Sequence, residues 1–403
     1  MFATLASMEV PKWSNKDKLA AVEGPGITLA AMQAFIPRLL SKLHVEMLVH
    51  GNATAAEALE LASVVVDGLA PRPLPLYLWP DCRVVDLSWK GRSDGEKVAT
   101  AAGDVDSEGD KSSVAKEKEG EEGGGVVPNG GSSSRKDATV GEGKWSALGP
   151  EYRHALVCPN AEETNSAVEV TFQVCLDDIR GRALLGLFTH LVKDKCFDQL
   201  RTKEQLGYLV WSGGSVHGGY VSNARFVVQS NDRSPEYLDQ RVEAFLAGFR
   251  ETITSLTPEM FEANVQAVVD LIMEKDKNLS QETARHWDEV LCRAFFFDRD
   301  AKEAAITSTL TPADLLEFYD RYFAPRGEGR RKMATWVHGN QFPINGAEGA
   351  AGDGENEREG REGRGVVMIH DYNEFKRSMP LLPLRKPPVL GEVSGGQPSN
   401  SKL

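Results

Sequence analysis

The sequence predicts an α+β fold made of two related domains, the second complete and the first truncated at its N-terminal side. Three observations lead to this prediction. Short stretches alternate apolar and polar residues as strands do, longer stretches show helical periodicity behind N-cap residues, and one helix-and-strand unit occurs twice. The 403 residues are enough for two or three domains, and an apolar content of 41% allows a sizeable core.

The repeat relates residues 27–39 (ITLAAMQAFIPRL) to residues 310–322 (LTPADLLEFYDRY). Each copy is followed by a stretch of strand character that ends in the tetrapeptide VHGN. The second copy follows a predicted strand, a hairpin and several helices, whereas almost nothing precedes the first. This difference predicts a truncated first domain. Identical residues occupy three equivalent positions, namely Thr28 and Thr311, Phe35 and Phe318, and Arg38 and Arg321.

In the first region, alternation over residues 43–49 predicts a strand, and Gly51-Asn52 predicts a turn. Residues 54–57 (TAAE) form a capping box, in which Thr and Glu side chains satisfy backbone N–H groups at the start of a helix. The predicted apolar face of this helix consists of Leu59, Ala62, Val65, Val66 and Leu69.

The second region begins near residue 150. Within it, a strand is predicted from the alternating apolar residues Val168, Val170, Phe172 and Val174. A long helix is predicted over residues 181–205, followed by a hairpin that extends to residue 230. N-cap chemistry places helix starts near Ser234, Thr257, Ser280 and Thr311. Residues 331–340 (RKMATWVHGN) predict a closing strand.

Three segments are too polar and too rich in Gly, Ser or Pro to bury a core. Residues 91–145 and 345–365 are expected to be disordered insertions, and residues 387–403 a flexible tail. The predicted folded parts are therefore residues 1–90, residues 146–344, and a C-terminal segment, residues 366–386, that packs on the second domain.

Composition argues against several functions. The net charge of −13 disfavours nucleic acid and anionic membrane as partners, because both would repel an acidic surface. The five cysteines are odd in number, widely spaced and without a CxxC pair, which argues against a disulfide framework and a cysteine-built zinc site. The sequence shows no secretory signal and no apolar run of membrane-spanning length.

Residues 196–213 (CFDQLRTKEQLGYLVWSG) resemble the signature of the fourth domain of insulin-degrading enzymes, which are insulinase-type zinc metallopeptidases. Four further stretches agree and occur in the family's order. The resemblance covers nearly all of the chain outside the insertions and the ends, and it implies that both predicted domains are insulinase-type. The four stretches are FIPRLLSKLHVEMLVHGN (35–52), YLDQRVEAFL (237–246), FFFDRD (295–300) and NEFKRSMPLLPLRKP (373–387).

The resemblance also implies a mechanism. Two halves of such enzymes close around a chamber, and the N-terminal half holds zinc through an HxxEH motif whose Glu is the general base. The C-terminal half supplies substrate contacts. Arg201 and Tyr208 match the family's Arg and Tyr in RTKEQLGY, which donate hydrogen bonds near the scissile carbonyl, and Phe197 matches a residue that lines an apolar subsite.

The chain departs from the family in lacking HxxEH. The nearest segment is residues 286–290 (HWDEV), in which Val290 replaces the second histidine. One imidazole with no second ligand near it would hold zinc weakly. We therefore assign no metal ligand, expect zinc to be bound by an absent N-terminal half, and expect the chain alone neither to bind zinc tightly nor to cleave peptides.

Each candidate residue also has an ordinary structural explanation. His44, Glu46 and His50 share one face of the predicted strand, but exposed polar residues on an alternating strand need no special role. His190 is interpreted as a structural helix residue and Cys196 as an ordinary thiol. Without the resemblance, Arg201 would be part of a solvated charged face and Tyr208 a packing residue.

Three functions remain open. The first is the C-terminal half of a peptide-degrading zinc metalloendopeptidase, with peptides as substrates and a catalytic N-terminal half or partner chain. The second is a non-catalytic companion, as in the mitochondrial processing peptidase, and the third is a free-standing peptide-binding module. A second copy of the same chain is a further partner to consider.

The last three residues, Ser401, Lys402 and Leu403, form the C-terminal tripeptide that the peroxisomal import receptor reads. They follow a Gly, Pro and Ser-rich stretch that should remain extended and reachable. Insulin-degrading enzymes can end in a similar tripeptide. We therefore expect a peroxisomal protein with a cytosolic pool.

Overall fold

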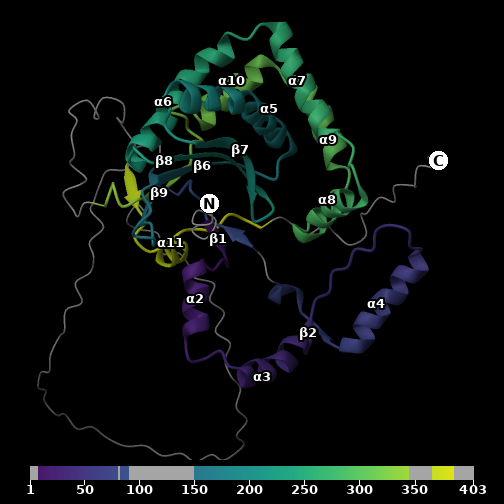
Figure 1. The fold of residues 1–403 in the computed structure, drawn as a ribbon. Coiled ribbons are helices and arrows are strands. Elements are labelled where there is room, and N and C mark those ends of the chain that lie inside the picture. Colours follow the sequence, from purple (N-terminus) through teal and green to yellow (C-terminus); the bar gives the residue numbers. More distant parts are fainter. Residues whose placement is uncertain (1–7, 80–81, 90–148, 345–364, 385–403) are drawn as a thin grey trace, which may run out of the picture. The chain divides into compact units, whose positions relative to one another are not determined.

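A computed structural model describes residues 8–79, 82–89, 149–344 and 365–384. The expected insertion at 91–145, all but the last residue of the insertion at 345–365, and the tail at 387–403 with its targeting tripeptide lie outside the described residues. The described part is a mixed α+β structure, as the sequence predicts (Figure 1).

A mixed six-stranded sheet organises residues 149–384, in the order β10-β5-β9-β6-β8-β7. Strands β10, β5 and β9 run parallel, whereas β9, β6, β8 and β7 are antiparallel neighbours. The hairpin predicted from the sequence is the β7–β8 pair. The strands are β5 (Glu151–Val157), β6 (Ser166–Leu176), β7 (Leu209–His217), β8 (Val221–Ser230), β9 (Lys332–His338) and β10 (Val366–Met368).

Helices cover one face of this sheet, as Figure 1 shows for α5, α6 and α10. The main core lies between them, because every second residue of β6, from Val168 to Val174, points to this face and is buried. The helices are α5 (Ile179–Cys196), a π-helix (Phe197–Lys203), α6 (Pro235–Thr254), α7 (Pro258–Ile272), α8 (Leu279–Leu291), α9 (Arg299–Thr307) and α10 (Pro312–Tyr322).

A smaller core forms from residues of both ends of the chain. Met8, Val84 and Val85 are buried together with Phe375 and Leu382. Two short strands pair here, β1 (Glu9–Val10) with β4 (Arg83–Val84), and α11 (Tyr372–Ser378) lies beside them. The amide of Gln173, on β6, bonds the backbone of Val85 and Leu87, so the N-terminal residues are tied to the large sheet.

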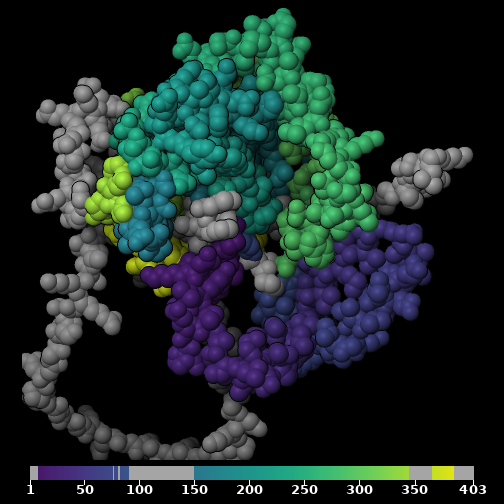
Figure 2. All heavy atoms as spheres, in the orientation of Figure 1, coloured from purple at the N-terminus to yellow at the C-terminus, as the bar shows by residue number. Residues whose placement is uncertain are grey.

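The remaining N-terminal helices have no buried residue, and much of the surface of these elements is exposed (purple and blue in Figure 2). The three helices among them begin at side-chain N-caps. One is the predicted capping box, in which Thr54 and Glu57 satisfy each other's backbone N–H groups. The elements are α2 (Asn15–Glu23), α3 (Leu29–Leu40), β2 (Lys42–Leu43), α4 (Ala55–Leu69), β3 (Arg72–Pro73) and a single 3₁₀ turn (Leu76–Leu78).

The predicted strand over residues 43–49 is wrong. Only Lys42 and Leu43 pair, with β3, and residues 44–50 have no regular structure. Alternation marks a segment suited to a strand, but a strand also needs a neighbouring strand to bond its N–H and C=O groups. None of the described residues offers that neighbour.

The two copies of the repeat share local structure but differ in packing. Thr28 and Thr311 both cap their helices. In α10, Phe318 is 5% exposed and belongs to the main core, whereas the equivalent Phe35 in α3 is 46% exposed. The repeated residues therefore specify the helix, and the surrounding sheet decides whether its apolar face is buried.

Three smaller differences concern helices. The predicted helix over 181–205 is α5 followed by a π-helix, the third predicted helix starts at the cap Asn278 instead of Ser280, and the helices α2, α9 and α11 were not predicted. Among the described residues, no helix combines the length and apolar character needed to cross a membrane.

Candidate functional site

Phe197 and Arg201 both lie on the π-helix that continues α5. Four residues apart on this helix, they emerge on nearly the same side. π-helical turns are rare and often occur at functional sites. Phe197 is 49% exposed, so a large aromatic side chain stands in solvent next to a long cation. This pair of residue types suits contact with a partly apolar, carbonyl-bearing ligand.

The end of the π-helix is anchored by an ion pair. Arg241, on α6, donates two hydrogen bonds to the Glu204 carboxylate, at 2.7 and 2.8 Å. Gln199 donates a third at 2.7 Å. Arg241, as the largest cause, lowers the pKa of Glu204. A bidentate pair of this kind holds backbone geometry as well as charge, so the residues after Glu204 start from a defined position.

The next three residues turn the chain toward β7. Gln205 adopts a left-handed conformation (φ +50°), and Leu206 donates its N–H to the Leu200 carbonyl and is buried. Gly207 lies against β8, where a Cβ would be only 1.8 Å from the carbonyl oxygen of Gln229. Only glycine fits such an approach. Residues 204–208 therefore form a compact turn in which position 207 must be glycine for steric reasons.

The turn brings Arg201 and Tyr208 together. The Arg201 guanidinium carbon lies 5.1 Å from the centre of the Tyr208 ring, within the range of a cation–π contact. Tyr208 is 89% exposed. Within the described residues, no carboxylate pairs with Arg201 and nothing bonds the Tyr208 hydroxyl. Their donor groups are thus available to a ligand.

Two side chains near the turn play no such part. Cys196 is fully buried, and burial raises the pKa of its thiol to about 12. It is therefore neither a nucleophile nor easily oxidised. His190 lies on α5 and is half-buried. It precedes Arg201 by almost three helical turns.

A buried network of ion pairs between the sheet and α6 was not predicted from the sequence. The Lys332 ammonium lies 2.7 Å from carboxylate oxygens of both Asp239 and Glu243, and Arg330 lies 2.6 Å from Glu243. Lys332 and Asp239 are almost wholly buried. The network joins β9 to α6. Its only sequence signal is the unusual placement of charges inside core-forming stretches, and the pairing itself depends on the fold.

Metal-ligating residue types also gather near the N-terminal elements. His44 Nε2 donates a hydrogen bond to the Glu46 carboxylate at 3.0 Å, and its ring stacks on Trp79. His50, which the sequence placed on the same strand face, instead lies beside α8. In the segment 286–290, Glu289 bonds Arg299 and Val290 is buried, so this segment does not act as an HxxEH motif.

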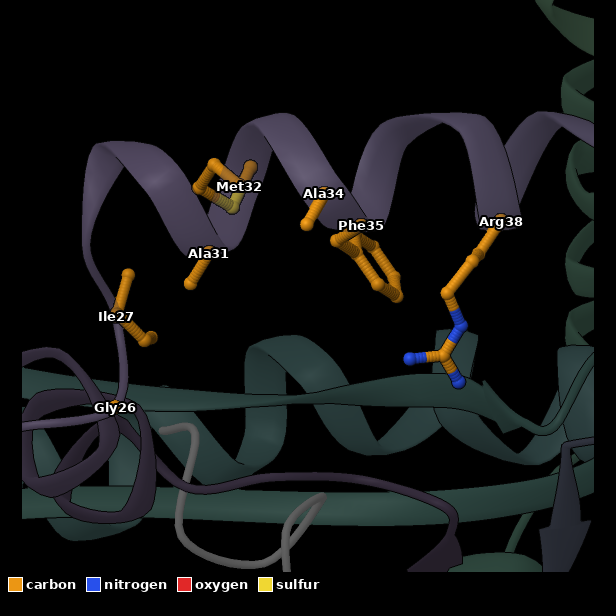
Figure 3. A pocket seen from close by; sticks show the side chains of 7 residues that line it. All are labelled: Gly26, Ile27, Ala31, Met32, Ala34, Phe35 and Arg38. Atoms are coloured by element: carbon orange, nitrogen blue, oxygen red, sulfur yellow. The ribbon is translucent and has the colours of Figure 1, made fainter.

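The inner side of α3 is hollowed instead of packed. A recess of about 340 Å³ lies beneath the helix (Figure 3). Its lining is apolar except for the Arg38 side chain, which extends from the last turn of the helix. The lining residues are Gly26, Ile27, Ala31, Met32, Ala34, Phe35 and Arg38.

Comparisons with known proteins agree with this architecture. Residues 187–287 match the family described as PQQ synthase PqqF-like, C-terminal lobe domain 4. The chain is 30% identical to insulin-degrading enzyme of Mus musculus over 387 residues, which are 94% of this chain and 31% of that protein. It is 32% identical over 182 residues to the insulin-degrading enzyme-like 1, peroxisomal, of Arabidopsis thaliana, covering 45% of this chain and 19% of that protein.

The crystal structure of pitrilysin has the same fold, with a TM-score of 0.62 and 21% identity, over 93% of this chain and 31% of that chain. The chain thus spans about a third of the length of its relatives. The matched part includes the turn that carries Phe197, Arg201 and Tyr208. This chain is an insulinase (M16) family homologue that corresponds to a C-terminal part of insulin-degrading enzyme.

Proposed function

We propose that this chain is the substrate-contacting C-terminal half of an insulinase-type zinc metalloendopeptidase that cleaves small peptides in a closed chamber. The observation that carries the proposal is the pair formed by half-buried Arg201 and exposed Tyr208, whose guanidinium carbon and ring centre an anchored turn holds 5.1 Å apart. A guanidinium and a phenol both donate hydrogen bonds. Side by side, and with no hydrogen-bonding or ion-pair partner among the described residues, they suit the carbonyl groups of a peptide.

The chemistry of the pair fits transition-state stabilisation. When a hydroxide attacks a peptide carbonyl, negative charge develops on the carbonyl oxygen, and preorganised donors aimed at it lower the barrier. Arg201 supplies positive charge and Tyr208 a neutral donor. Phe197, on the same helix, supplies an apolar surface for a substrate side chain. The general base and the catalytic zinc come from an HxxEH motif on a separate half, where the metal would activate water and polarise the carbonyl.

A non-catalytic companion subunit and a peptide-binding module are the alternatives. Both would use the same surface to hold a peptide without turnover. The apolar recess under α3 does not distinguish the three functions, because a catalytic half, a partner subunit and a bound peptide would each be able to cover its apolar side chains. Peptidase activity, measured after the chain is combined with an HxxEH-bearing N-terminal half, distinguishes the peptidase half from these two alternatives.

The test combines the purified chain with the HxxEH-bearing N-terminal half of mouse insulin-degrading enzyme, and follows hydrolysis of a quenched fluorescent peptide. Neither polypeptide alone should cleave the peptide, and the mixture should do so in a zinc-dependent manner. The N-terminal half of the same enzyme mixed with its own C-terminal half is the positive control. An inactive mixture that nevertheless forms a stable complex and binds the peptide would favour the companion function.

We also propose a peroxisomal location with a cytosolic pool, based on Ser401, Lys402 and Leu403 and on the peroxisomal relative from Arabidopsis thaliana. A fluorescent protein fused to the N-terminus should give peroxisomal puncta that disappear when Leu403 is deleted. Diffuse fluorescence from the intact fusion, or puncta that survive the deletion, would refute this location.

A further inference from the structure

Three metal-ligating side chains from distant parts of the sequence meet at the start of α8. Glu282 and His286 are four residues apart on this helix and so share a face. His50, from the irregular segment before the Gly51 turn, lies against them. One ligand atom from each residue falls within 4.8 Å of the other two. His50 Nε2 and His286 Nε2 lie 3.8 and 4.0 Å from the same Glu282 oxygen.

A neighbouring hydroxyl orients the His50 ring. The Thr283 hydroxyl donates its proton to the Leu279 carbonyl, at 2.7 Å. Its oxygen can therefore only accept from His50 Nδ1, which lies 2.7 Å away. This assigns the Nδ1–H form to neutral His50, and its Nε2 lone pair then faces Glu282. Histidines that bind metals characteristically donate their other N–H to such a partner.

The facing atoms of His50 and Glu282 have the same hydrogen-bonding character. A neutral imidazole Nε2 and a carboxylate oxygen are both acceptors, so at 3.8 Å they do not bond each other directly. A metal ion placed between them would satisfy both. Tetrahedral zinc with bonds of 2.0–2.1 Å separates its ligand atoms by about 3.4 Å. To reach this separation, the half-buried side chains would need to shorten each His–Glu distance by less than about 1 Å, and the distance between the two imidazoles, at most 4.8 Å, by no more than about 1.4 Å.

Two imidazoles and one carboxylate favour zinc over calcium or magnesium, which prefer oxygen ligands. We propose that His50, Glu282 and His286 form a zinc site, separate from any catalytic zinc, that fastens the segment before Gly51 to α8. Three protein ligands leave a fourth position for water. The proposal revises two expectations from the sequence, that His286 has no second imidazole near it and that the chain alone does not bind zinc tightly, because the fold supplies His50. It does not depend on the proposed peptidase function.

The test uses the full chain, stripped of metal with a chelator and dialysed. Zinc is titrated in competition with a chromogenic zinc indicator, and cobalt is added separately to follow its visible absorption. The wild-type chain should bind one zinc, give the intense cobalt absorption of a tetrahedral site, and unfold at a higher temperature with zinc. His50→Gln and His286→Gln should each weaken zinc binding by more than about tenfold, and Thr283→Val by about 10- to 100-fold.

Two matched controls locate the site. His44→Gln removes the neighbouring histidine bonded to Glu46, and His190→Gln removes one on α5. Both should bind zinc as the wild type does. The proposal is overturned if the metal-free wild type does not bind stoichiometric zinc, a result that needs no variant to fold. It is equally overturned if His50→Gln and His286→Gln bind as tightly as wild type, or if His44→Gln loses the metal.

Discussion

Gly207 lies so close to the carbonyl oxygen of Gln229 that a Cβ added to it would be 1.8 Å from that oxygen. The contact fixes where the chain leaves the turn and enters β7. Tyr208 is the next residue, so its direction depends on this close approach. The relationship connects a backbone constraint to the geometry of the candidate site.

Gly207→Ala should therefore destabilise the fold, by about 1–3 kcal/mol in the free energy of unfolding, because backbone must move to admit the methyl group. Gly248→Ala is the matched control. No atom lies within 4 Å of its added Cβ, and it is inside α6. That variant should be more stable than wild type by about 0.4–1 kcal/mol. Urea unfolding of the two variants checks the contrast, and equal stabilities would count against the steric account.

The buried network makes a second prediction. Lys332→Met should cost about 3–5 kcal/mol, because the buried Asp239 and the neighbouring Glu243 lose the cation that compensates them. Lys302→Met is the control, since Lys302 pairs with Asp298 on the surface and should contribute at most about 1 kcal/mol. Denaturant midpoints measure both. A Lys332→Met variant no less stable than the control would show that the network is dispensable.

The same network predicts acid sensitivity. Burial raises the pKa of Glu243, but Lys332 and Arg330 more than offset this and lower it from 4.5 to about 2. A carboxyl whose folded pKa is depressed contributes stability above the unfolded pKa, and that stability is lost as the pH falls through the folded value. Wild-type stability should decline between pH 4.5 and about 2, and less steeply in Glu243→Gln. If the free energy of unfolding, measured with urea, declines in parallel for wild type and Glu243→Gln as the pH falls, Glu243 is not the origin of the acid sensitivity.

Local features of the fold were predictable from the sequence. Thr54, Thr257 and Thr311 cap helices as expected, because capping uses bonds to residues two or three positions away. The alternation on β6 likewise predicted a strand, since its neighbours in the sheet are present. The failure at residues 43–49 has the opposite cause, because strand pairing depends on partners that alternation does not reveal.

Contacts between residues far apart in the chain could not be predicted from the sequence patterns. Lys332 meets Asp239, and His50 meets His286, only because the chain folds elements far apart in sequence against each other. The site residues Arg201 and Tyr208 were identified through a family resemblance, and residue type alone would have left them as surface side chains. Their proximity is a property of the structure, and their roles remain predictions.

The most direct measurement of the central claim is kcat for peptide hydrolysis by the complemented enzyme with variants of Arg201 and Tyr208. Arg201→Ala and Tyr208→Phe each remove a donor aimed at the developing oxyanion, and each should lower kcat by about 10²–10³. Lys203→Ala, which removes an exposed ion pair with Asp198 on the same helix, should leave kcat unchanged. Wild-type kcat in both Arg201→Ala and Tyr208→Phe would contradict the account and make these residues structural.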